Sequence, residues 1–180
     1  MNAAATKKEV QVTTVTPRII RVLKIATAPT LSESAVLTYH VGVTNDGEIL
    51  FRLWKNTGKG FFSAEWISIN AIKAASDKVP ADKPITSIIL NPLFIGRSAN
   101  NPSFLFAVLK QEGFVQRSEI DIRCYDRIEP TGFMAEIDEL MKSDVSLDPD
   151  GKPKKLPKKK VEGALPSSAS TEATIPAAVE

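Results

Sequence analysis

The residue types best suited to nucleophilic catalysis or metal binding are few in this chain, and they lie far apart in the sequence. His40 is the only histidine and Cys124 is the only cysteine. Nucleophilic catalysis needs a thiol and an imidazole in hydrogen-bond contact, and no local motif brings these two together. A zinc site needs about four nitrogen or sulfur ligands, which one His and one Cys do not supply. We therefore expect a neutral structural His40, a Cys124 that packs within a strand, and no metal site.

Two other patterns could suggest catalysis. Residues 56–60 read NTGKG, and a phosphate-binding loop requires Gly-Lys-Ser or Gly-Lys-Thr at the start of a helix. Here Lys59 is followed by another glycine and two phenylalanines. The carboxylates of Glu136, Asp138 and Glu139 suit a solvated helix face better than an acid–base pair. We expect no enzymatic activity and no cofactor.

Aromatic and basic residues are close together just after this loop. Phe61, Phe62 and Trp66 follow Lys55 and Lys59. Single-stranded nucleic acids bind where bases stack on aromatic rings and lysines attract phosphates. The favoured interpretation is instead that the three rings form a hydrophobic core beneath the preceding strands. Both interpretations stay open at the level of sequence.

The charge of the chain is nearly balanced, with a formal net charge of +2. Residues 17–128 hold 14 lysines and arginines against 10 acidic residues, and residues 129–142 carry a net charge of −3. Further lysines lie close together between Lys152 and Lys160. This distribution permits a polyanionic partner without requiring one. Residues 1–9 lack the apolar core of an export signal, and no apolar stretch could span a bilayer, so we expect a cytoplasmic protein without membrane contact.

A β-hairpin is the most distinct structural pattern. Residues 35–43 (AVLTYHVGV) and 48–54 (EILFRLW) read as strands, and the intervening Thr-Asn-Asp-Gly reads as a tight turn. Alternation along the second strand predicts one face with Ile49, Phe51 and Leu53 and another with Leu50, Arg52 and Trp54.

Several flanking segments have helical patterns. Residues 17–25 (PRIIRVLKI) have apolar residues at helical spacing after a proline suited to a first turn, and a strand is the competing interpretation. Ser68 is a suitable N-cap for a helix over residues 69–76. Residues 85–94 are strongly apolar and predict either a helix or a buried strand, interrupted near Pro92.

The next segments predict a helix and a second hairpin. Asn101 is a suitable N-cap for a helix over residues 102–112, which begins with proline. Gly113 should end this helix in the left-handed conformation. Residues 114–117 and 120–125 then predict two paired strands.

Part of this pattern, the stretch FAVLKQEGFVQR at residues 106–117, resembles winged-helix DNA-binding domains. In that family a helix ends in a leucine, charged residues and a glycine, and enters a strand with a basic residue near its start. The matching positions are Leu109, Glu112, Gly113, Phe114, Val115 and Arg117. The resemblance covers residues 85–125 and implies a recognition helix at 102–112 and a wing at 114–125.

The predicted organisation is one domain with a tail. Residues 131–142 predict an amphipathic helix that closes a domain over residues 10–142. Residues 1–9 should be frayed, and residues 143–180, rich in Lys and Pro, should be disordered. The predicted fold class is α+β, with an antiparallel hairpin region packed against a winged-helix-like unit.

The expected function is nucleic-acid binding without catalysis. The stretches GFFSAEW and GRSANNPSFLFAVLKQEGFV resemble small proteins of bacterial plasmids and integrated elements, which implies a bacterial origin. We expect an accessory or regulatory protein of a bacterial mobile element, with DNA more than RNA as the partner. The candidate contact residues of the domain are Arg97, Asn100, Asn101, Ser103, Lys110, Arg117 and Arg123. The candidate tail residues are Lys154, Lys155, Lys158, Lys159 and Lys160. The alternative is a protein-binding adaptor or inhibitor that acts through the apolar hairpin and the acidic helix 131–142.

Overall fold

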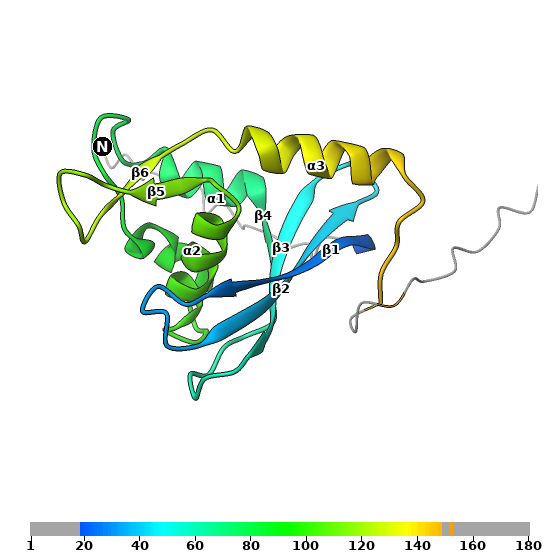
Figure 1. Cartoon of the computed structure of the whole chain (residues 1–180), viewed down its shortest axis with the longest axis horizontal. Coiled ribbons are helices and arrows are strands. Elements are labelled where there is room, and N and C mark those ends of the chain that lie inside the picture. Colours follow the sequence, from blue (N-terminus) through cyan, green and yellow to red (C-terminus); the bar gives the residue numbers. More distant parts are fainter. Residues whose placement is uncertain (1–18, 149–151, 153–180) are drawn as a thin grey trace, which may run out of the picture.

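A computed structural model describes residues 19–148 and Lys152. Its centre is an antiparallel sheet with the strand order β1-β2-β3-β4 (Figure 1). The strands are β1 (Ile19–Pro29), β2 (Val36–Thr44), β3 (Ile49–Asn56) and β4 (Trp66–Ser68). Helices complete the fold, so the predicted α+β class is confirmed.

The predicted hairpin is the pair β2–β3. Val43 pairs with Ile49, and the backbone N–H of Thr44 donates to the carbonyl of Glu48 at 3.0 Å. Gly47 has a φ of 79°, which a glycine adopts without a steric penalty. Ile49, Phe51 and Leu53 are buried in the main core, as the alternation predicts.

The helical interpretation of residues 17–25 is wrong over the part that the structure describes. Ile19–Pro29 is an edge strand paired with β2. The pairing register shifts between Val22 and Lys24, so the strict alternation of a strand is lost there. That irregularity explains why the apolar spacing looks helical.

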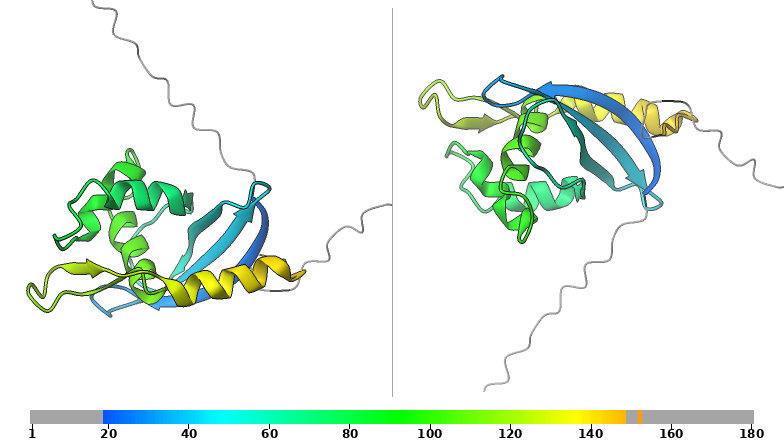
Figure 2. Two further views of the ribbon diagram at one scale, coloured as in Figure 1. Left: turned by 90° about the horizontal axis from the view of Figure 1, so that it is seen from above. Right: turned by 90° about the horizontal axis from the view of Figure 1, so that it is seen from below.

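Within the described residues, four helical segments lie around the sheet. They are α1 (Ile69–Ser76), the 3₁₀ helix η1 (Ser87–Phe94), α2 (Asn101–Gln111) and α3 (Thr131–Lys142). The side chain of Ser68 accepts from the backbone of Asn70 and Ala71, so the predicted N-cap of α1 is confirmed. Gly113, with a φ of 75°, follows α2 as predicted. Figure 2 shows α1 and α2 gathered at one end of the molecule and α3 running alongside the sheet.

Aromatic rings join these elements in the core. Phe51 of β3 stacks on Phe133 of α3 with 5.4 Å between ring centroids. Phe114, just after α2, meets Phe51 edge-on at 5.9 Å. Burial of such large apolar rings is a principal stabilising contribution to a small domain.

The second hairpin is shorter than the sequence predicts. It consists of β5 (Val115–Arg117) and β6 (Tyr125–Arg127). The prediction of a strand over residues 120–125 is wrong, because residues 118–124 form the connecting loop. Ile85 pairs with Tyr125 on the other side of β6 and leads directly into η1.

The contacts of the fold continue past α3. Leu147 pairs with Val22, and Arg21 donates to the carbonyls of Met141 and Ser143. The ordered contacts therefore extend beyond Lys142, where the sequence predicts the domain to end. No helix within the described residues is long and apolar enough to span a membrane.

Candidate binding surfaces

Most arginines of the domain serve internal contacts. Five of the six arginines among residues 19–148 have a side chain engaged with other groups of the protein; these are Arg21, Arg52, Arg97, Arg117 and Arg127. Arg123, in the loop of the small hairpin, is the remaining one. A guanidinium that is engaged in this way has fewer N–H donors left for a phosphate backbone.

Arg52 illustrates how fully such a side chain is used. Its guanidinium lies 4.6 Å from the ring centroid of Trp54 and 4.6 Å from that of Trp66. It also lies 2.9 Å from Nδ1 of His40. Burial lowers the pKa of Arg52, and two aromatic faces help to compensate its charge. His40 is buried in this cluster, as expected of a structural histidine.

The helix that the resemblance assigns to DNA recognition is α2, and it is largely buried. Its buried residues are Asn101, Pro102, Leu105, Phe106, Ala107, Val108 and Leu109. Gln111 is exposed, and Ser103 and Lys110 are half-buried. A helix that enters the major groove must expose a whole face. This placement of α2 leaves no such face.

Asn101 has a structural role. Its amide oxygen accepts from the backbone N–H of Ser63 at 2.9 Å, and its amide nitrogen donates to the carbonyl of Ser63 at 3.0 Å. The side chain is fully buried, and the N-cap position belongs to Asn100. The expectation that Asn101 caps the helix and contacts bases is therefore corrected.

The two loops that precede β4 and α2 are joined around Phe61. Its carbonyl accepts from Asn100 Nδ2 at 2.9 Å and from Ser98 Oγ at 2.7 Å. Arg97 forms an ion pair of 2.5 Å with Glu65. Phe61 is 86% exposed, and Lys59, two positions earlier in the sequence, is also exposed. We call Lys59, Phe61, Arg97 and Asn100 the Phe61 surface.

The three aromatic residues after the glycine-rich loop do not form one group. Trp66 belongs to the Arg52 cluster, and Phe62 packs against the main core. The favoured expectation of a common core is wrong for Phe61, which faces solvent.

A second surface is the loop at residues 118–124 of the β5–β6 hairpin. Ile120 is 96% exposed and Ile122 is 71% exposed. Ile88 of η1 is 68% exposed. The Ile85–Tyr125 pairing is antiparallel, so the chain from Ile85 toward Ile88 and the chain from Tyr125 toward Ile122 run to the same end of the hairpin. We call Ile120 and Ile122 the isoleucine surface.

Hydrogen bonds hold this loop in one shape. The N–H of Ser118 donates to the carbonyl of Cys124 at 3.0 Å, and Arg117 Nη1 donates to the carbonyl of Ile122 at 3.0 Å. Asp121 accepts from the N–H of Arg123 at 2.9 Å. The outward position of the isoleucines is therefore built into the loop.

Cys124 also takes part in this loop. Its thiol donates to Asp121 Oδ2 at 3.3 Å, and this hydrogen bond raises the pKa of the thiol. A nucleophilic cysteine requires the opposite shift, because the thiolate is the reactive form. Cys124 precedes β6 and is half-buried, so it does not pack within a strand as the sequence predicts.

The structure divides the candidate nucleic-acid contacts between separate places. Arg97 and Asn100 belong to the Phe61 surface, whereas Arg117 and Arg123 belong to the hairpin. Lys110 is at the opposite end of α2 from Asn100, about 15 Å along the helix axis. Ser103 contacts Ser87. The tail lysines lie outside the described residues.

Sequence reasoning missed the isoleucine surface. The run Glu119-Ile120-Asp121-Ile122-Arg123 alternates apolar and charged residues, the pattern of a half-buried strand. The register of the β5–β6 pairing, in which Arg117 pairs with Tyr125, places these residues in the connecting loop beyond the paired part of the hairpin.

No family model, no curated protein and no solved structure matches this chain.

Proposed function

We propose that this chain is a protein-binding module and that the isoleucine surface contacts the partner. The observation that carries the proposal is the near-complete exposure of Ile120 on a loop held by its own hydrogen bonds. A large apolar side chain fixed toward water gains free energy when a partner covers it. A loop that is restrained by its own hydrogen bonds also loses less conformational entropy on binding than an unrestrained one.

The charges around the isoleucines indicate the kind of partner. Glu119 and Asp121 alternate with Ile120 and Ile122, and Arg117 and Arg123 flank them. The acidic residues oppose contact with anionic lipid headgroups. An apolar pocket with a rim of mixed charge on another protein fits this arrangement better, because each rim charge then meets an opposite one.

The proposal is tested by capturing partners from cells and then reconstituting the complex with purified proteins. The variant Ile120→Asp/Ile122→Asp should lower the affinity at least about tenfold, because each isoleucine is an anchor for a pocket. The matched control is Val36→Asp, which changes an exposed apolar residue on β2, outside the β5–β6 hairpin. Equal affinity of wild type and the double variant for every reconstituted partner would refute the proposal.

A second candidate function is nucleic-acid binding, and the Phe61 surface favours it. An exposed ring next to Lys59 could stack on an unpaired base while the lysine attracts the phosphate. The surface is small, so most of the affinity would come from the tail lysines. DNA of a bacterial mobile element remains the proposed nucleic acid for this candidate.

A salt titration tests this second candidate. Labelled single-stranded and duplex DNA are titrated with the full chain, with Phe61→Ala, and with a chain that ends at Lys152. That endpoint retains Leu147, which pairs with Val22. The candidate requires that Phe61→Ala weakens single-stranded binding and that affinity falls with salt. Absence of binding at low salt would eliminate it.

A further inference from the structure

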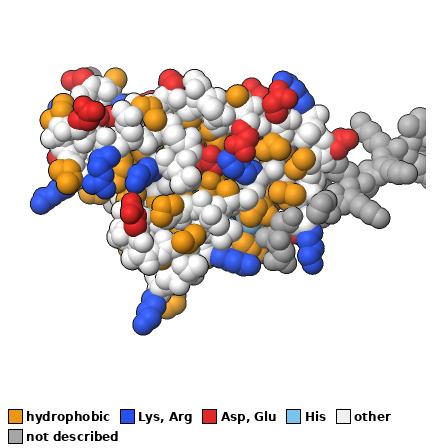
Figure 3. Space-filling view, viewed as in Figure 1, with side chains coloured by type: hydrophobic (Ala, Val, Ile, Leu, Met, Phe, Trp, Pro, Cys, Tyr) orange, Lys and Arg blue, Asp and Glu red, His pale blue; other side chains and the backbone are white. Residues whose placement is uncertain are grey.

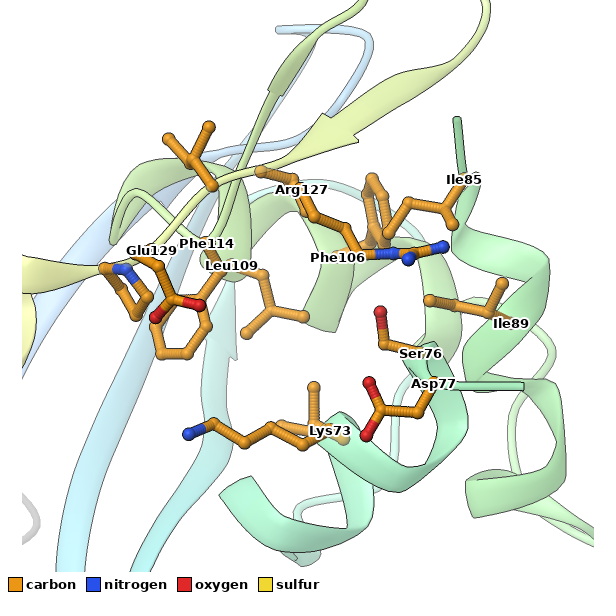
Figure 4. A pocket seen from close by; sticks show the side chains of 14 residues that line it. Lys73, Ser76, Asp77, Ile85, Ile89, Phe106, Leu109, Phe114, Arg127 and Glu129 are labelled. Carbon is orange, nitrogen blue, oxygen red and sulfur yellow. The ribbon is translucent and has the colours of Figure 1, made fainter. Parts of the chain in front are cut away.

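A cavity of about 210 Å³ lies where α1, η1, α2 and the β5–β6 hairpin meet (Figure 4). Its inner wall is apolar. The lining residues come from α1, the first turn of η1, α2 and the β5–β6 hairpin. The wall residues include Ile72, Ile85, Phe106 and Leu109, all of them buried. The cavity is thus an opening into the main core, and an apolar group that entered it would lose its contact with water.

The rim of the cavity carries both signs of charge. Lys73 and Asp77 come from α1 and the residue after it, and Arg127 and Glu129 come from β6 and the segment that follows. Figure 4 shows Glu129 across the opening from Asp77. Within the described residues, Lys73, Asp77 and Glu129 take part in none of the ion pairs. Three charged side chains at the rim are therefore available to a ligand.

Arg127 differs from these three because it is held in place. Its Nη2 donates to the carbonyls of Val79 and Pro80, each at 3.0 Å. The guanidinium therefore stays at the cavity wall as a fixed positive charge. A carboxylate close to it is favoured by electrostatic attraction even without a direct hydrogen bond.

We propose that this cavity binds a free α-amino acid with a branched aliphatic or aromatic side chain. The side chain would lie against Phe106 and Leu109. The carboxylate would face Lys73, with Arg127 as a fixed positive charge on the other side of the opening, and the ammonium would face the carboxylate of Asp77 (Figure 4).

The size of the cavity supports this class of ligand. An engineered apolar cavity of about 150 Å³ in another protein binds benzene. A volume of about 210 Å³ is larger, so it has room for one leucine or phenylalanine side chain and part of the polar group. A ligand with only one sign of charge would leave half of the rim uncompensated.

The ligand class is tested by titrating the full chain and following its backbone amide resonances. The probes are L-leucine, glycine, 3-methylbutylamine and 4-methylpentanoate. L-leucine should shift resonances of the cavity residues, and each of the other three should bind at least about tenfold more weakly, because each lacks one of the three required groups. Equal binding of 4-methylpentanoate or the amine would overturn the proposal, as would absence of any shift with leucine.

Charge variants locate the site. Lys73→Gln should weaken leucine binding by about three- to tenfold, because it removes the partner of the carboxylate. Lys78→Gln is the matched control, since Lys78 is an exposed lysine near the same helix that does not line the cavity. Both substitutions are at exposed positions, so folding should be retained and is checked by thermal unfolding. Equal effects of the two variants would overturn the assignment of the site.

Discussion

Lys24 of β1 and Glu112, the residue after α2, form a half-buried ion pair with 2.9 Å between Nζ and Oε1. The hydroxyl of Tyr39 on β2 donates to the same carboxylate, and Glu136 of α3 lies 2.8 Å from Lys24. A carboxylate at the C-terminal end of a helix is opposed by the helix dipole. Lys24 offsets this cost and connects the sheet edge to two helices.

We expect the contributions of Lys24 and Glu112 to the free energy of unfolding to be coupled. Lys24→Met and Glu112→Gln should each lower the free energy of unfolding by about 2–4 kcal/mol, because each removes an opposite charge from the other, partly buried group. The double variant should be destabilised by less than the sum of the single variants. Urea unfolding measures all three. The control pair Glu139 and Lys142 is exposed, so its coupling should stay below about 0.5 kcal/mol.

The same network predicts a loss of stability at high pH. Burial, followed by the hydrogen bond to Glu112, raises the pKa of Tyr39 above its ordinary value of 10.0. Burial alone would lower the pKa of Lys24, but the hydrogen bonds and charges of Glu136 and Glu112 outweigh it and raise this pKa above 10.5. Both groups therefore hold their protons more tightly in the folded state, and their contribution is complete below pH 10 and is lost as the pH rises.

Tyr39→Phe should make this pH dependence weaker. Tyr39 is one of the groups that bind a proton in the folded state and lose it in the unfolded state above pH 10. Without it, the decrease of the free energy of unfolding with pH becomes shallower by up to about 1.4 kcal/mol per pH unit. Urea unfolding at a series of pH values measures the slope. Identical slopes for wild type and Tyr39→Phe would contradict the raised pKa.

The Arg52 cluster can be followed by intrinsic fluorescence, because Trp54 and Trp66 are the only tryptophans of the chain. Arg52→Met should lower the free energy of unfolding by about 1–3 kcal/mol through the loss of two cation–π contacts. It should also change the emission spectrum of the folded protein. Arg123→Met, at an exposed loop position, should do neither.

Replacing either of two glycines with alanine should change the stability of the protein, in opposite directions for the two positions. Gly113 has a φ of 75°, so Gly113→Ala should cost about 1–2 kcal/mol. Gly132 lies in α3, and a methyl group there would have no heavy atom within 4 Å, so Gly132→Ala should stabilise the protein by about 0.5–1 kcal/mol. Thermal unfolding of both variants measures the difference. Equal signs would contradict the conformations assigned to these residues.

Elements whose signals are local could be predicted from the sequence. The turn around Gly47, the cap at Ser68 and the stop at Gly113 each depend on the conformational preference or hydrogen bonding of one residue. The helix over residues 131–142 has the predicted bounds, because its apolar spacing is regular and no glycine or proline interrupts its later turns.

The tertiary structure decided the remaining features. Residues 19–25 could be read as a helix until the pairing with β2 and its register shift made them a strand. Apolar residues of α2 predict burial on one face, whereas contacts with both the sheet and η1 bury most of this helix. The exposure of Ile120 depends on the register of the β5–β6 hairpin, in which Arg117 pairs with Tyr125 and residues 118–124 stay outside the paired strands. Such features depend on which segments pair and in which register, and a local sequence pattern does not settle that choice.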